Sequence, residues 1–112
     1  MILLSTTQSS IICEQLFNSQ LAAPVYYTWV LTRKGSFENV IFSGDDFSWS
    51  SQYWSGFTVS VSFTVSSPTG SNPIIKANPG EWVYNVYQSN TQYNMTPVGQ
   101  SIANGICIIN NN

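Results

Sequence analysis

The chain has 112 residues and a formal net charge of −2, and only 7% of its residues are charged, whereas 14% are aromatic. A chain of this length fits a single domain, residues 1–112, and its three cations are too few to neutralise a nucleic-acid backbone. Because it contains no histidine and no closely spaced cysteine pair, a zinc site is excluded, and we expect no cofactor.

The first residues, Met1 to Leu4, are apolar, but no positive charge precedes them and a polar run follows at once. This pattern lacks the parts of a signal peptide, so we expect none. The longest apolar runs are far shorter than the ~20 residues that cross a bilayer, so we expect no membrane partner. Residues Ser10 to Phe17 are expected to open the sheet.

Two cysteines, Cys13 and Cys107, lie near opposite ends of the chain. Neighbouring terminal strands would allow a disulfide between them. The alternative is two small apolar core residues with free thiols. Because no secretion signal is visible, the free thiols are favoured.

The segment from Val25 to Arg33 is β-branched and aromatic throughout, which is typical of a strand. Arg33 to Ser36 supplies a turn that contains Gly35, and Glu38 to Ser43 resumes an extended pattern. The two segments are predicted to form a β-hairpin.

The densest aromatic segment runs from Phe47 to Phe57, where rings are interleaved with serine and glutamine. Rings beside hydrogen-bonding groups suit a protein interface or a platform on which sugars stack. Contact with the core or with another subunit is favoured over a glycan site. Together with one ring from a later strand, the candidate interface residues are Phe47, Trp49, Tyr53, Trp54 and Tyr87, and Trp54 is the preferred anchor.

The stretch from Phe57 to Val65 alternates strictly between large apolar side chains and hydroxyls. Successive side chains of a strand point to opposite faces, so this pattern predicts a half-buried β-strand. The side chains expected to face the core are Phe57, Val59, Val61, Phe63 and Val65.

The turn residues Asn78 to Gly80 introduce a strand from Glu81 to Gln88, which is apolar on both faces and therefore expected to be central or covered. Ile102 to Ile109 is expected to close the sheet, and Asn110 to Asn112 to form a short solvated tail. The connecting segments carry no helical periodicity. The predicted fold is all-β: a single antiparallel β-sandwich of about six to eight strands without substantial helix.

The carboxylates are scattered over different predicted elements, apart from the adjacent pair Asp45 and Asp46. That pair is more typical of a turn, where aspartate bonds its own backbone, than of a Ca²⁺ site, which needs six or more oxygens. The serines have no histidine beside them to act as a base. We therefore expect no enzyme activity and no catalytic residues.

Several pieces of the sequence follow one another in a distinctive order. They are Pro24 to Trp29, Val40 to Phe42, Asp45 to Ser48, Tyr53 to Phe57 and Pro79 to Tyr87, with a return from Ile102 to Ile109 that contains Gly105. In this order they resemble a group of small β-sandwich proteins encoded by tailed bacteriophages of Bacteroidetes hosts. The resemblance implies an auxiliary virion component without catalytic residues.

Charge poverty and this resemblance together predict a structural virion protein that is made in the host cytoplasm. It is expected to attach in multiple copies to a capsid, head-tail or tail surface, as a capsid-decoration protein does, with other virion proteins as partners. The alternative is a carbohydrate- or receptor-binding β-sandwich module, in which Trp49, Tyr53 and Trp54 stack on a host glycan. Exposed rings favour the second, and rings covered by a neighbouring chain favour the first.

Overall fold

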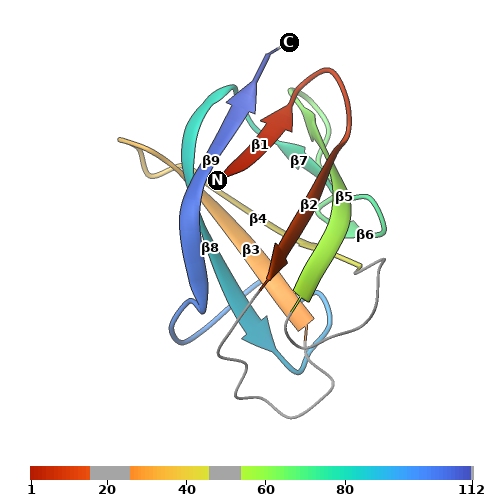
Figure 1. Ribbon diagram of the computed structural model, residues 1–112, viewed down its shortest axis with the longest axis vertical. Coiled ribbons are helices and arrows are strands. Elements are labelled where there is room, and N and C mark those ends of the chain that lie inside the picture. Colours follow the sequence, from red (N-terminus) through yellow and green to blue (C-terminus); the bar gives the residue numbers. More distant parts are fainter. Residues whose placement is uncertain (16–25, 46–53, 112) are drawn as a thin grey trace.

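The computed structural model describes residues 1–15, 26–45 and 54–111, and every regular element in these ranges is a β-strand (Figure 1). The strands of the described residues are β1 (Ile2–Ser5), β2 (Ser10–Gln15), β3 (Tyr26–Arg33), β4 (Asn39–Gly44), β5 (Trp54–Ser62), β6 (Thr69–Gly70), β7 (Ile74–Lys76), β8 (Gly80–Ser89) and β9 (Ala103–Asn110). The expectation of an all-β protein is confirmed for this part of the chain.

The strands form two sheets. The larger one has the order β1-β9-β8-β3-β4-β6 and the smaller one the order β2-β5-β7. Neighbouring long strands pair antiparallel, whereas β1–β9, β4–β6 and β5–β7 pair parallel, so the prediction of a purely antiparallel fold is wrong. Each parallel pair joins strands that do not follow one another directly in the chain, so no tight hairpin dictates their direction.

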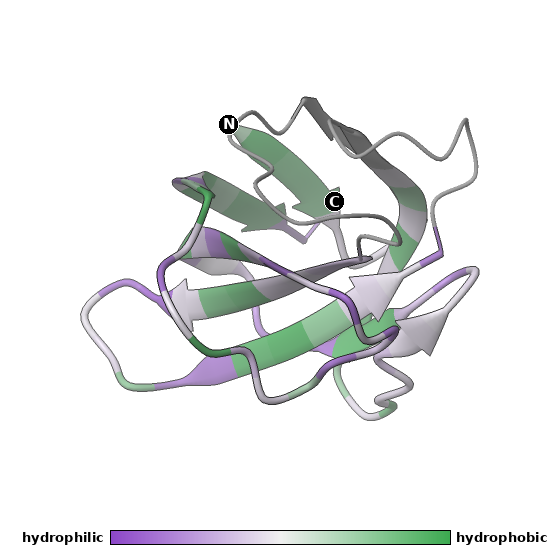
Figure 2. Cartoon of the chain, turned by 90° about the horizontal axis from the view of Figure 1, so that it is seen from below, coloured by the Kyte–Doolittle hydropathy of each residue, from purple (hydrophilic) through white to green (hydrophobic). Residues whose placement is uncertain are grey.

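One apolar core lies between the two sheets, in a sandwich-like arrangement. It combines Ile12, Phe57, Val59 and Ile75 of the smaller sheet with a larger set from the other sheet, which includes Leu4, Leu31, Trp82, Val86 and Ile109. Trp29 connects the layers, since its ring centroid lies 6.0 Å from that of Phe57. Figure 2 shows apolar stretches along the strands and polar ones in many of the connections.

The hairpin and the central strand are confirmed. β3 and β4 pair with Trp29 opposite Phe42, and the turn between them carries Gly35 at a φ of 80°, a value that glycine adopts without strain. β8 lies between β3 and β9, as expected of a strand with two apolar faces.

The alternating segment is only partly as predicted. Phe57, Val59 and Val61 are buried, but Phe63 and Val65 are 50% and 51% exposed. β5 ends at Ser62, whose Oγ accepts hydrogen bonds from the backbone N–H groups of residues 64 and 65. This serine turn redirects the chain, so the inward alternation stops two apolar residues early.

Three strands that the sequence patterns did not indicate are β1, β6 and β7. The strand expected to open the sheet begins at Ser10 as β2, and its last predicted residues lie outside the described ranges. The end of β9 is held against the segment after β1, because the backbone N–H of Thr6 donates to the carbonyl of Asn110 at 2.9 Å.

Two glycines allow the core rings to pack against backbone. A Cβ at residue 44 would lie 2.3 Å from the Phe57 ring, and one at Gly105 would lie 2.6 Å from the Tyr84 ring. No carbon can approach this closely, so a side chain at either position forces the ring to move.

We predict that Gly105→Ala lowers the free energy of unfolding by about 1–3 kcal/mol, because overpacking displaces Tyr84. Without a clash, the same exchange would stabilise the chain by about 0.4–1 kcal/mol through the unfolded state, so the sign of the change reports the contact. Urea unfolding measures it, with the exposed neighbouring Asn104→Ala as the control, which should change stability by less than about 0.5 kcal/mol. If Gly105→Ala and Asn104→Ala were equally stable, the close contact between Gly105 and the Tyr84 ring would be contradicted.

Cys107 is a free thiol that is fully buried in the core, so it takes no part in a disulfide. Burial raises the pKa of this thiol to about 12, and the nearby N-terminal ammonium only partly opposes the rise. A thiol that resists ionisation is a poor nucleophile, so Cys107 is a packing residue.

The raised pKa of Cys107 predicts a pH dependence of stability. The thiol of the unfolded chain ionises near pH 8.5, while the folded one stays protonated to about pH 12. This contribution is therefore complete below about pH 8.5 and is lost as the pH rises toward 12, by up to about 1.4 kcal/mol per pH unit. Denaturant midpoints of the wild-type chain and Cys107→Ala across this range test it: the stability difference between them should shrink as the pH rises.

Candidate interaction surface

Of the five predicted interface residues, two lie on described strands. Phe47, Trp49 and Tyr53 lie outside the described ranges. Trp54 begins β5, where its backbone pairs with that of Gln15. Tyr87 lies on β8, on the side of the larger sheet that faces away from the core, and it is half-buried.

Tyr87 belongs to a wider surface, which we call the outer face. Strand alternation sets it, because Trp82, Tyr84 and Val86 of β8 point into the core and the residues between them point out. The outer face comprises Leu3, Val30, Thr32, Ile41, Glu81, Val83, Asn85, Tyr87, Asn104, Ile106 and Ile108.

Strand register brings the apolar members of the outer face together. Ile106 lies opposite Val83, which lies opposite Thr32. In the next row, Val30 lies opposite Ile41. β-branched side chains therefore follow one another across four strands, although they come from distant parts of the sequence.

By the same alternation, Glu81 at one end of β8 is the one charged side chain that the described strands place on the outer face, opposite Ile108. Its carboxylate forms an ion pair with Lys34, at 2.7 Å from Oε2 to Nζ, and the hydrogen bond to Glu81 raises the pKa of Lys34. Both groups remain substantially exposed, so this pair contributes little to stability. The other side chains of the outer face carry no charge. Another protein can therefore cover them without removing water from a charged group, which suits a protein interface.

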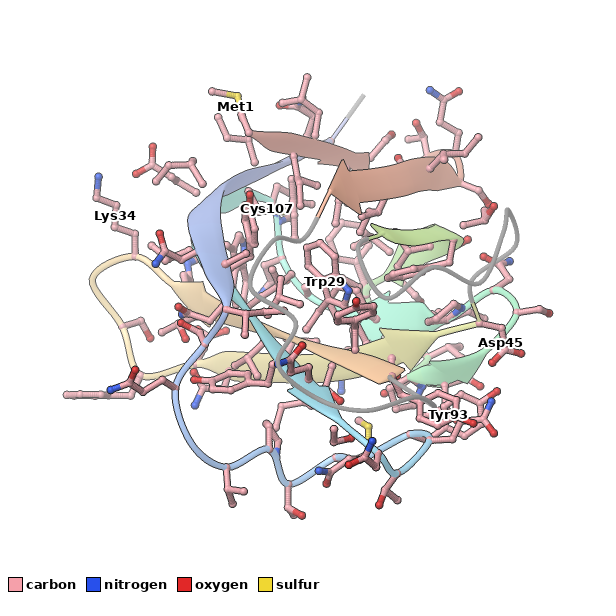
Figure 3. The ribbon with its side chains drawn as sticks, turned by 60° about the horizontal axis from the view of Figure 1, so that its bottom comes forward. Met1, Trp29, Lys34, Asp45, Tyr93 and Cys107 are labelled. Atoms are coloured by element: carbon pink, nitrogen blue, oxygen red, sulfur yellow. The ribbon has the colours of Figure 1, made fainter. Side chains whose placement is uncertain are left out.

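Part of the sheet beside the outer face is already covered by the connection between β8 and β9. The hydroxyl of Thr28 donates to the backbone carbonyl of Asn94 at 2.8 Å, and Thr28 is buried as a result. In Figure 3 this connection runs along the side of β3 and β8 that faces away from the core. The uncovered part of the outer face is therefore centred on Val83 and Ile106.

A second polar cluster ties the same connection to the end of β4. The hydroxyl of Tyr93 donates to Oδ1 of Asp45, and the Gln92 amide donates to the same oxygen at 3.4 Å (Figure 3). Tyr93 has a φ of 56°, the left-handed region, so its backbone is held in a conformation that a tyrosine rarely adopts. Asp45 thus serves as an acceptor that joins two loops.

Comparisons with known proteins do not assign this chain to a family. No family model, no curated protein and no solved structure matches this chain. Among the described residues, none lies in a helix with the length and apolarity needed to traverse a membrane.

The hydrogen bond between Tyr93 and Asp45 predicts how the pKa of the Tyr93 phenol responds to mutation. The hydrogen bond to Asp45, with lesser help from burial and from the carboxylate charge, raises the pKa of the Tyr93 phenol. The contact therefore stabilises the loop at neutral pH and is lost as the pH rises through that pKa. Asp45→Ala should lower the pKa of Tyr93 toward its usual 10.0, followed by NMR titration of the ring carbon, whereas the control Gln92→Ala should leave it raised. An unchanged titration in Asp45→Ala would contradict the assignment.

Proposed function

We propose that this chain is a non-enzymatic structural protein of a tailed-phage virion, folded as a single β-sandwich, which attaches to a capsid, head-tail or tail surface. The observation that carries the proposal is the outer face, on which Glu81 is the one charged side chain of the described strands. This face offers β-branched and aromatic side chains across several strands, with short polar groups between them. Such a surface is covered by another protein at little electrostatic cost.

Low overall charge supports the same function. An independent soluble domain keeps apart from its neighbours through a surface of which about a quarter to a third is charged. This chain has three cations and five carboxylates in all. Assembly with partner proteins would then keep this chain from aggregating. The isolated protein should precipitate near its sequence pI of about 4.5.

Two of the described carboxylates support a role without catalysis, because each is engaged in a contact within the fold. Glu81 pairs with Lys34, and Asp45 accepts from Tyr93. Glu38 is exposed beside the hairpin turn, where the Ser36 hydroxyl accepts a hydrogen bond from its backbone N–H. Glycoside hydrolysis needs two carboxylates across one bond, whereas the carboxylates of Glu81 and Asp45 are engaged in separate contacts.

The experiment is to introduce a lysine into the outer face and to measure the number of copies per purified virion by quantitative mass spectrometry. Val83→Lys should fold, since its side chain points away from the core, and should reduce incorporation at least about tenfold, because burying an unpaired charge in an interface costs several kcal/mol. The matched control is Thr58→Lys, an outward-facing strand position of the smaller sheet, which should incorporate normally.

The outcomes separate this function from the carbohydrate- or receptor-binding alternative. Absence of the wild-type chain from virions, or normal incorporation of Val83→Lys, would overturn the proposal. A glycan-binding module would instead lose retention on host glycans in Trp54→Ala and keep its place in the particle. Both properties are measured on the same preparations.

A further inference from the structure

Among the described strands, β1 is at the edge of the larger sheet and pairs only with β9. An edge strand presents backbone N–H and C=O groups that accept another strand. Proteins usually blunt such an edge with a charge, a proline, a bulge or a covering loop. In residues 1–13 there is no charged side chain, no proline and no glycine.

The direction of the β1 backbone groups follows from one hydrogen bond. The N–H of Thr6 donates to the carbonyl of Asn110 on β9, and Leu3 lies opposite Ile108 in the parallel register. In a strand, alternate residues direct their backbone groups to opposite sides, so Leu4, like Thr6, turns them toward β9. The N–H and C=O of Leu3 therefore point away from β9, toward the free edge.

The side chains of β1 leave that edge accessible. Ile2 and Leu4 are buried in the core, whereas Leu3 is 59% exposed on the outer face. An open groove of about 200 Å³ is lined by Leu3, Leu4 and Ser5 together with Gln8, Ser10 and Asn110. The turn between β1 and β2 thus leaves an open groove beside β1.

We propose that β1 pairs antiparallel with β1 of a second copy of this chain, about a two-fold axis at Leu3. Each Leu3 N–H donates to the Leu3 carbonyl of the other copy, which uses the two backbone groups that point outward. In this register Ile2 lies opposite Leu4, so apolar residues meet on the core side. Leu3 meets Leu3 on the outer face.

A second copy fits this edge better than an unrelated strand does, because β1 is complementary to itself. Its sequence Ile-Leu-Leu-Ser places apolar residues at both positions that the two-fold axis brings together, and it carries no charge that self-pairing would set against a like charge. An interface of this kind is isologous, with the same patch on both partners. Because β1 has only four residues, the pair is weak and forms at high concentration, as on a crowded assembly.

The test is a pair of opposite charges at residue 3. Sedimentation equilibrium of the full chain up to about millimolar concentration should show an average mass that rises toward twice the 12.4 kDa of one chain. Leu3→Lys alone and Leu3→Glu alone should each remain monomeric, because like charges meet at the two-fold axis. An equimolar mixture of the two should associate again. The matched control Val98→Lys changes an exposed valine in the β8–β9 connection and should associate like the wild type.

Amide hydrogen exchange provides a second test of the β1 pairing, beside the mass measured by sedimentation. The exchange of the Leu3 amide hydrogen should slow as the wild-type concentration rises, whereas the folded Leu3→Lys variant should show no such dependence. A wild-type chain that stays monomeric, a Leu3→Lys variant that still associates, or a mixture that fails to associate would each overturn the β1 pairing.

This inference goes beyond the proposed function and does not rest on it. Val83→Lys changes the outer face away from β1 and should leave the mass of the pair unchanged. Loss of incorporation with intact association, or the reverse, therefore identifies which of the two proposals has failed.

Discussion

The structure depends on a single ring between the two sheets. Trp29 is fully buried, and it contacts Phe57 of the smaller sheet as well as Phe42 and Tyr84 of its own. Among the described residues its indole N–H has no hydrogen-bond partner, a cost that the ring contacts must offset. The size of these rings also explains the glycines, because Gly44 and Gly105 are where a ring rests directly on backbone.

Charge is the second constraint, and the described charges lie away from the middle of both sheets. Arg33 stacks over the buried Trp82 ring at 5.8 Å, beside the Lys34–Glu81 ion pair at the hairpin end. Asp45 is engaged at the β4 end with Tyr93. The sheet surfaces carry mainly β-branched residues, hydroxyls and amides. Such side chains do not repel a partner protein, and they do little to keep the isolated chain in solution.

Elements set by local pattern were predictable. The hairpin of β3 and β4 has a turn signal between two β-rich runs, and β8 follows Asn78 to Gly80. β1, β6 and β7 are short, and each pairs parallel with a strand that does not directly precede or follow it in the chain, so no local pattern specified them. For the same reason the sequence points to Tyr87 as an interface candidate but not to Ile106, which the register places opposite Val83 on the same face. Cross-strand register is a property of the fold.

The two proposed surfaces reinforce each other geometrically. In an antiparallel β1 pair the residues opposite one another point to the same side, so the two-fold axis stands perpendicular to the sheet. Both outer faces then look in one direction, with Leu3 at the centre of a continuous sheet. Under the two proposals, a pair would dock on a particle with two patches at once, and the second contact would form at the high effective concentration set by the first. Two interactions that are each weak would therefore give firm attachment only where the particle surface presents two matching sites side by side.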